Sequence, residues 1–232
     1  DISPLLSNIR GIKDKQELSK IKKACSISDK IMQEVMENIT IFRTESEVKK
    51  YLMKRGMDFG CEMAFDPLVA SGKNSSYVHY EDCNKKIKKG FFYVDFGVDY
   101  MGYKSDITRT TYIGQPPARE KELYNHLLKV QQDTVRMVQP GIKTSELDNY
   151  VRKHLGDLSA YFTHSLGHGV GIEVHEKPIV SSKAEEKLQE GMVLTIEPGI
   201  YFPGKYGMRV EDTVEVTKRG AKILTRAPKH QL

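Results

Sequence analysis

The sequence predicts an α+β fold built from two similar halves. Each half has a short helix with a Thr-Glu or Thr-Ser start, an apolar strand between two glycines that ends near a carboxylate, and a later acidic residue followed closely by Thr. The matching segments are Thr44–Val48 with Thr144–Leu147, Gly90–Gly97 with Gly191–Gly199, and Asp106–Thr108 with Glu211–Thr213. Short apolar strands resemble one another by chance, so one match alone is weak. All three matches in the same order favour a duplicated half.

The first half opens with an amphipathic helix from about Lys13 to Asn38, where apolar residues recur at helical spacing. A capping-box pattern predicts a second helix from Thr44 to about Arg55, with Gly56 and Gly60 breaking it. Apolar and β-branched runs then predict strands. These runs are Phe65–Ala70, Phe91–Phe96 and Ile107–Ile113, with Ser71–Ser76 as a polar loop.

The second half repeats this order. Pro116 and Pro117 introduce a helix to about Val138, because proline is favoured in the first turn. A further helix is expected from Thr144 to about Leu155. Three strand-like stretches follow, at Tyr161–His164, Met192–Ile196 and Val210–Thr217.

Composition narrows the class of protein. The 232 residues are 39% hydrophobic and 29% charged, which is typical of a globular protein. The net charge of +5 is spread along the chain, so we expect neither nucleic acid nor a membrane as a partner. No apolar run reaches the roughly 18 residues of a membrane span. Cys25, Cys61 and Cys83 cannot all pair and form no Cys-x-x-Cys motif, so we expect structural thiols and a cytoplasmic location.

Carboxylates gather at the ends of the predicted strands of both halves. They are Asp95, Asp106, Glu197 and Glu211. Acidic groups that share one interior repel each other unless a cation lies among them. Hard divalent cations take carboxylate oxygens, so the pattern predicts a metal site. A lone carboxylate would more simply cap a turn or pair with Lys, but four in matching halves argue against that.

Histidines form the second group of candidates. His164, His168 and His175 lie in one glycine-rich run, and His79 follows the polar loop. The alternating glycines at 167, 169 and 171 would let the backbone approach a ligand or bend tightly. A phosphate-binding loop is a weaker interpretation, because no Gly-Lys-Ser/Thr ending follows.

Together these segments resemble the pita-bread metallopeptidases. The resemblance rests on Asp95–Gly97, Asp106–Thr110, His164–Gly171 with His175–Glu176, Thr195–Tyr201, and Arg209–Thr213. Within that superfamily the match is to the proline-specific branch, the Xaa-Pro dipeptidases (prolidases) and Xaa-Pro aminopeptidases. The resemblance covers essentially the whole chain. It implies the pita-bread fold shared by creatinase and methionine aminopeptidase, a pseudo-twofold α+β domain.

The resemblance also implies a site for two divalent metal ions. Its ligands correspond to Asp95, Asp106, His168, Glu197 and Glu211. Asp106 and Glu211 would bridge the ions, Asp95 would complete one, and His168 and Glu197 the other. Oxygen and imidazole ligands without thiolate suit Mn, Co, Fe or Zn.

The expected activity is hydrolysis of the Xaa-Pro bond at the N-terminus of dipeptides or short peptides. Glu197 would accept a proton from the attacking water, and His79 and His175 would stabilise the oxyanion. The substrate-binding residues implied by the family are His79, His164, His175 and Arg209.

Arg209 has two interpretations. Its forked guanidinium could bind a substrate carboxylate through two oxygens. It could instead neutralise the carboxylate cluster through Glu211 or Asp212.

The resemblance gives a single metallopeptidase catalytic domain over residues 1–232, without the additional N-terminal domain that proline-specific members usually carry. In the family that domain helps to form a dimer, so a homodimer is an open expectation. Short proline-containing peptides are the expected partners.

Three other members of the fold class are alternatives. Methionine aminopeptidase is disfavoured because Val69–His79 lacks its Cys-His-Gly pattern, and because His164 and Arg209 favour the proline branch. A non-catalytic peptide-binding module and a metal-free amidinohydrolase are disfavoured because all the ligand positions are occupied by ligand residues.

Overall fold

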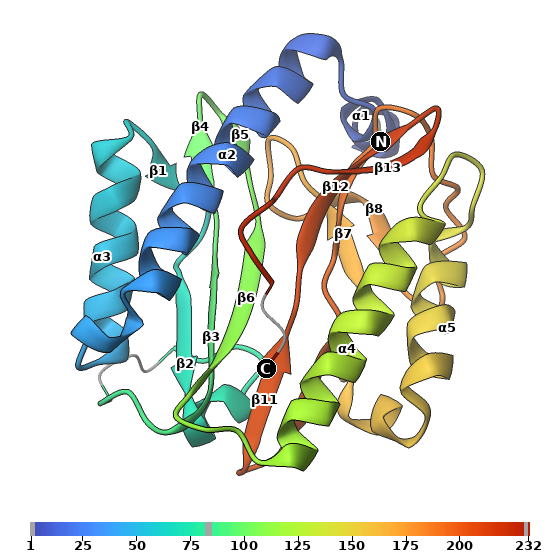
Figure 1. Cartoon of the computed structure of the whole chain (residues 1–232). Helices are drawn as coiled ribbons and strands as arrows, with labels where there is room; N and C mark the ends of the chain where they lie inside the picture. Colours follow the sequence, from blue (N-terminus) through green and yellow to red (C-terminus); the bar gives the residue numbers. More distant parts are fainter. Residues whose placement is uncertain (1–2, 82–84, 230–231) are drawn as a thin grey trace.

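The structure is a computed structural model and describes residues 3–81, 85–229 and 232. Two pairs of helices frame a group of strands, with α2 and α3 on one side and α4 and α5 on the other (Figure 1). Their bounds are Lys15–Glu37 for α2, Glu45–Asp58 for α3, Ala118–Met137 for α4 and Thr144–Leu155 for α5. One apolar core packs α2 and α3 on the first strands, and a second packs α4 and α5 on the later strands.

Local sequence determines where the first helices begin. The Asp14 side chain accepts hydrogen bonds from the N–H groups of Gln16 and Glu17, and the Asp14 N–H donates to the Glu17 carboxylate. Thr44 caps α3 by accepting a 3.1 Å bond from the Glu47 N–H. These contacts satisfy N–H groups that have no partner inside the helix.

The prediction that Gly56 breaks α3 is wrong, because the helix continues to Asp58. Gly56 is buried, and a Cβ at this position would lie 3.0 Å from Met63 Sδ. Glycine is therefore used here for close packing inside the helix. Phe59 is the C-cap that follows Asp58, and its N–H still donates to the Arg55 carbonyl.

The first half is built on a three-stranded antiparallel sheet of order β2-β3-β6. Its strands are β2 (Leu68–Ser71), β3 (Gly90–Phe96) and β6 (Ile107–Ile113). Beside it lies a small sheet of β1 (Glu62–Met63), β4 (Val98–Tyr100) and β5 (Tyr103–Lys104). A 3-10 turn, Gly72–Ser76, follows β2 and occupies the predicted polar loop.

The second half contains a five-stranded sheet of order β13-β12-β9-β7-β8. Its strands are β7 (Gly167–Gly169), β8 (Glu176–Val180), β9 (Val193–Ile196), β12 (Asp212–Thr217) and β13 (Gly220–Ile223). The hairpin of β10 (Gly199–Phe202) and β11 (Tyr206–Arg209) completes this half.

The predicted repeat is confirmed in the order of elements. A long helix, a short helix and an antiparallel strand pair occur twice, with β3–β6 in one half and β9–β12 in the other. The registers of the two pairs differ. In the first pair, Asp95 lies opposite Thr108. The second pair ends with Ile196 opposite Asp212, and the next residue outward on each strand is a glutamate of the predicted site, Glu197 or Glu211.

Strand β6 and the segment before β12 join the halves. The Glu211 N–H donates to the Thr108 carbonyl at 3.3 Å, and the Thr110 hydroxyl donates to the Arg209 carbonyl at 2.7 Å. These bonds bring the start of β6 beside the start of β12. Candidate residues that are a hundred positions apart in sequence thus become neighbours.

The predicted strand Tyr161–His164 is wrong. A 3-10 helix, Gly156–Tyr161, ends there, and the chain then runs irregularly to β7. The Arg152 guanidinium donates hydrogen bonds to the carbonyls of Phe162 and His164, at 3.1 and 2.9 Å. These carbonyls therefore bond to a helix side chain instead of a neighbouring strand. The elements that were not predicted are helix α1 (Ser3–Gly11) and strands β1, β4, β5, β7, β8, β10, β11 and β13.

Candidate metal centre and active site

Three of the predicted ligands form a compact cluster where the halves meet. One ligand atom from each of Asp106, His168 and Glu211 lies within 4.8 Å of the others. Asp106 precedes β6, His168 lies in β7, and Glu211 precedes β12, so both halves contribute. Carboxylate oxygens and an imidazole nitrogen at this spacing can share a divalent cation.

Asp95 and Glu197 extend this cluster. His168 Nε2 lies 3.2 Å from Glu197 Oε1 and 3.6 Å from Asp106 Oδ2. Asp95 Oδ2 accepts a hydrogen bond from Arg209 Nη2. The structure thus brings together all five residues predicted as ligands.

Two buried oxygens of the cluster have no hydrogen-bond donor among the described residues. They are Asp95 Oδ1 and Glu211 Oε1. A buried carboxylate oxygen without a partner is costly, and buried polar atoms are nearly always satisfied in native proteins. Cations at this place would satisfy both atoms, so the donor set fits the metal ions that the resemblance implies.

The electrostatics of the cluster show the same deficit of positive charge. Burial, and after it the charge of Glu211, raises the pKa of Asp106 well above its usual value. Burial also raises the pKa of Glu211 well above its usual value, with Glu197 and Asp95 adding to the effect. Like charges in a buried site disfavour ionisation unless a cation is present.

His168 and Glu197 behave differently because they face each other. Burial would raise the pKa of Glu197, but the hydrogen bond and charge of His168 lower it to about 2. Burial would lower the pKa of His168, but the contact with Glu197 raises it. An imidazole must lose its proton to bind a metal, so cation binding at His168 competes with this proton.

Two threonines that the sequence analysis missed hold the glutamates. The Thr108 hydroxyl donates to Glu211 Oε2 at 2.8 Å, and the Thr195 hydroxyl donates to Glu197 Oε1 at 3.1 Å. Thr108 lies two positions after Asp106, and Thr195 two positions before Glu197. Since side chains two apart in a strand share a face, this spacing was the signal that could have found them.

A pocket of about 370 Å³ opens over the cluster. The predicted substrate histidines His79, His164 and His175 all line it. Its apolar wall, which was not predicted, consists of Phe65, Leu68, Val78, Val174 and Ile179. The pocket therefore combines metal-ligand chemistry on one side with a surface that can pack an apolar group on the other.

His164 lines the pocket, but protein partners occupy both of its ring nitrogens. Nδ1 lies 2.8 Å from the Ser165 carbonyl, so it carries the proton, and Nε2 accepts from the Tyr201 hydroxyl at 3.2 Å. Burial lowers the pKa of His164 to about 4, so the ring is neutral at neutral pH. Tyr201, also missed from sequence, accepts a 2.7 Å bond from Arg209.

Arg209 neutralises a carboxylate of the cluster, and its partner is Asp95 instead of Glu211 or Asp212. The side chain is almost fully buried. Its Nε also donates to the Thr108 hydroxyl at 3.1 Å, and its Nη1 donates to the Tyr201 hydroxyl at 2.7 Å and to the Val78 carbonyl at 3.4 Å. Asp212 instead accepts a hydrogen bond from the guanidinium of Arg109, with 2.9 Å between Arg109 Nη2 and Asp212 Oδ1.

The alternating glycines allow backbone to approach backbone. A Cβ at Gly167 would lie 2.1 Å from the Thr195 carbonyl oxygen, and a Cβ at Gly169 would lie 2.0 Å from that of Lys177. Side chains at these positions cannot coexist with β9 and β8. The glycines therefore let β7 carry His168 between its neighbours, and Gly167 also lines the pocket.

Two α+β halves around a buried carboxylate–imidazole cluster define a metallopeptidase with the pita-bread fold. The chain belongs to metallopeptidase family M24, whose sequence pattern matches residues 19–218.

The chain is similar in sequence to two archaeal enzymes. It is 43% identical over 231 residues to an Xaa-Pro dipeptidase of Pyrococcus horikoshii, covering 97% of this chain and 65% of the relative. It is 42% identical over 237 residues to an Xaa-Pro dipeptidase of Pyrococcus furiosus, covering 100% of this chain and 68% of the relative. The chain thus spans about two thirds of the length of these relatives.

Solved structures give the same picture. The prolidase from Pyrococcus horikoshii OT3 matches with a TM-score of 0.95 at 40% identity, covering 100% of this chain and 68% of that chain. The X-Pro aminopeptidase from Thermotoga maritima MSB8 matches with a TM-score of 0.94 at 36% identity, covering 99% of this chain and 66% of that chain. Both names come from the proline-specific branch expected from the sequence.

Proposed function

We propose that this chain carries the catalytic centre of an Xaa-Pro peptidase that acts at the N-terminus of dipeptides or short peptides. The observation that carries the proposal is the gathering of Asp106, His168 and Glu211 within 4.8 Å, next to a pocket that Asp106 and His168 line together with other histidines and apolar side chains. The names of the similar proteins support the same substrate class.

The proposed cofactor is a pair of divalent metal ions, drawn from Mn, Co, Fe and Zn. Asp106 and Glu211 would be shared by both ions, Asp95 would complete one, and His168 and Glu197 the other. When bound, such ions lower the pKa of water and polarise a carbonyl. The unpartnered oxygens of Asp95 and Glu211 support this assignment.

The residues of the chain then have distinct proposed roles. Glu197, whose pKa is lowered to about 2, is ionised at neutral pH and can accept a proton from the attacking water. His79 and His175 are exposed at the pocket and can donate hydrogen bonds to the developing oxyanion. His164 serves as a neutral wall of the pocket.

Proline explains the apolar part of the pocket. A peptide bond before proline has no N–H to recognise, so affinity must come from packing of the ring and from the groups around it. Phe65, Val78 and Ile179 provide apolar surface for such packing. Of the two interpretations of Arg209, its contacts favour neutralisation. Only an N–H that does not bond to Asp95, Tyr201, Thr108 or the Val78 carbonyl could reach a substrate carboxylate.

The test compares Ala-Pro, Ala-Pro-Ala and a Met-Ala peptide as substrates, with Mn or Co added to metal-analysed protein. We expect Ala-Pro to be cleaved with the highest kcat/KM. Preference for Ala-Pro-Ala would instead make the chain an Xaa-Pro aminopeptidase, the activity named for the Thermotoga maritima neighbour. Preference for Met-Ala would assign methionine aminopeptidase. Absence of all three activities in metal-loaded protein would favour a non-catalytic peptide-binding module.

The remaining proposals concern the setting of the site. We infer that residues 1–232 act as one catalytic domain, in the cytoplasm and as a homodimer, without nucleic acid or a membrane as partner. Cys25 and Cys61 are buried free thiols, which supports a reducing compartment, while Cys83 lies outside the described residues. In the part of the chain that the structure describes, no helix is long and apolar enough to cross a membrane. Light scattering of the purified protein tests the dimer.

A further inference from the structure

The segment that carries His175 is fastened to the junction between α1 and α2. Glu176, the next residue, accepts a hydrogen bond from Lys13 Nζ at 2.7 Å and another from Arg10 Nη2 at 3.2 Å. The Lys13 side chain is only 1% exposed and that of Glu176 only 8%. A buried ion pair of this kind depends on both partners, since either charge alone would be costly.

The Glu176 carboxylate also organises the loop from within. Its Oε2 accepts a 3.3 Å bond from the Glu173 N–H, and the Gly171 N–H donates to the Glu173 carbonyl at 3.0 Å. A Cβ at Gly171 would lie 2.5 Å from Glu176 Oε1. The third glycine of the run is therefore the position that makes room for this carboxylate.

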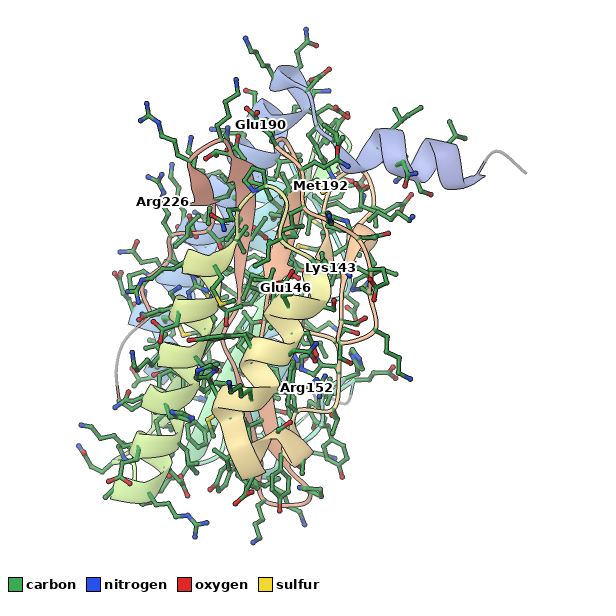
Figure 2. The ribbon with its side chains drawn as sticks, turned by 90° about the vertical axis from the view of Figure 1, so that its right-hand side faces the viewer. Lys143, Glu146, Arg152, Glu190, Met192 and Arg226 are labelled. Atoms are coloured by element: carbon green, nitrogen blue, oxygen red, sulfur yellow. The ribbon has the colours of Figure 1, made fainter. Side chains whose placement is uncertain are left out.

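Backbone interactions hold Lys13, the partner of Glu176, in place. The Lys13 N–H donates to the Gly191 carbonyl at 3.0 Å, and Ile12 forms an antiparallel bridge with Met192. Figure 2 shows Glu190 and Met192 at the end of the molecule from which α1 projects. Met192 directly precedes β9, the strand that leads to Glu197, so Lys13 is fixed to the same framework as the metal centre.

His175 has no such support of its own. Among the described residues its side chain makes no hydrogen bond, and its ring lies 4.2 Å from the ring of His168, centroid to centroid. The place of the imidazole in the pocket is therefore set by the backbone on either side of it.

We propose that Lys13 and Arg10, acting through Glu176, are positioning residues that hold His175 at the substrate pocket. The inference rests on the proposed function of His175, and it adds to that site a contact from outside the pocket. Lys104 supports the tip of the same loop, where its Nζ donates to the Ile172 carbonyl at 2.8 Å. Glu176 fixes the base of the loop, next to the histidine.

The test is a double-mutant cycle with Lys13→Met and His175→Ala, measured with Ala-Pro and with bound metal quantified. Lys13→Met should lower kcat/KM by about tenfold to a hundredfold, mainly through kcat, because small misplacements of a catalytic group have effects of this size. Bound metal should be unchanged. In the His175→Ala background Lys13→Met should have little further effect, because the group that it positions is gone.

Lys22→Met is the matched control. Lys22 on α2 pairs with Glu215 at 2.8 Å, so it also joins the N-terminal helices to the second half, but without touching the His175 loop. It should keep kcat/KM close to that of the unmodified protein. Arg10→Gln, which leaves the buried Lys13–Glu176 pair intact, should give a smaller loss than Lys13→Met and serves if that variant does not fold.

Equal losses in both backgrounds, unchanged activity of Lys13→Met, or an equal loss in Lys22→Met would overturn the inference. Amide hydrogen exchange separates this outcome from a failure of the proposed function. If the unmodified, metal-loaded protein cleaves none of the peptides, the function is wrong. Faster exchange of residues 171–176 in Lys13→Met would then still show that the Lys13–Glu176 ion pair holds this loop in place, and unchanged exchange would refute that role.

Discussion

At the scale of single residues, the proposed metal centre depends on carboxylates that the protein itself holds in place. Glu211 is held through one oxygen by the Thr108 hydroxyl, while its other oxygen has no donor among the described residues. Such an arrangement orients a ligand and leaves one oxygen available for a cation.

Glu211→Gln should therefore remove both activity and metal. The amide replaces a negatively charged oxygen with a neutral group, so we expect kcat/KM for Ala-Pro to fall by more than about a hundredfold, since even groups that only support ligands are worth about 10- to 100-fold. Metal analysis after dialysis should show reduced occupancy. Thr108→Val serves as the comparison and should cause a smaller loss. Full occupancy and activity in Glu211→Gln would rule out the two-metal proposal.

Arg209→Lys distinguishes the two roles of this residue. Lysine keeps the positive charge but cannot contact Asp95, Tyr201 and Thr108 at the same time. On the contacts described, metal affinity should weaken by about tenfold, as expected when a supporting partner of a ligand is lost. A rise in KM for Ala-Pro with metal binding intact would instead show that Arg209 binds the substrate carboxylate.

At the scale of elements, β7 packs tightly against both of its neighbouring strands. It lies between β8 and β9, and its glycines at 167 and 169 face carbonyl oxygens of both neighbours. This close approach places His168 beside Glu197.

Gly169→Ala should destabilise the fold. Its Cβ would lie 2.0 Å from a backbone oxygen that cannot rotate away, and forced overpacking typically costs about 1–3 kcal/mol. Urea unfolding of the metal-loaded protein measures the loss. Gly11→Ala is the control, because the nearest atom to its Cβ would be 3.7 Å away, an ordinary contact. Equal stability of the two variants would contradict the packing explanation.

At the scale of the whole molecule, the two halves are joined through buried charge. The Arg109 guanidinium from the first half bonds to Asp212 at 2.9 Å and to the Ala227 carbonyl at 2.8 Å. The proposed metal centre lies at the same junction, so the occupancy of the site and the stability of the whole chain should be coupled.

Chelation should accordingly lower the Tm, and the effect should grow with pH. The pKa values of Asp106, Glu211 and His168 are all raised in the fold. A group with a raised folded-state pKa contributes stability below its unfolded pKa and loses that contribution as pH rises through the folded value. Without cations the protein should lose stability from about pH 4 upward as the carboxylates ionise, and further above about pH 6.5 as His168 loses its proton.

Thermal unfolding between pH 5 and 8, with added Mn or with chelator, measures this coupling. Glu197 does not reverse the trend, because its lowered pKa of about 2 affects stability only at acid pH. The Tm difference between the two conditions should widen toward pH 8. Parallel curves, or full activity in chelated and metal-analysed protein, would refute the role of the cations.

The sequence by itself determined the repeat and most helices, and it predicted the chemistry of the proposed metal centre. Helical periodicity and caps mark α2 and α3 because these signals lie within a few residues of one another. The four carboxylates were singled out because charged side chains next to apolar strands are unusual, whereas His168 entered the proposed ligand set through the family resemblance. The duplicated pattern then related the two sets of carboxylates.

Tertiary structure decided the partners of these residues, because each partner is distant in the chain. Arg209 was expected to bind a substrate carboxylate or, alternatively, Glu211 or Asp212, yet it bonds to Asp95, more than a hundred positions away. The strand expected at Tyr161–His164 is absent, and Arg152 donates hydrogen bonds to two of the backbone carbonyls in this segment. Glu176 looked like part of the histidine motif, but its ion pair with Lys13 exists only because the α1–α2 junction packs against β8 and against the segment before β9. Local sequence encodes a residue's chemistry and its element, whereas the packing of distant segments determines which charge it faces.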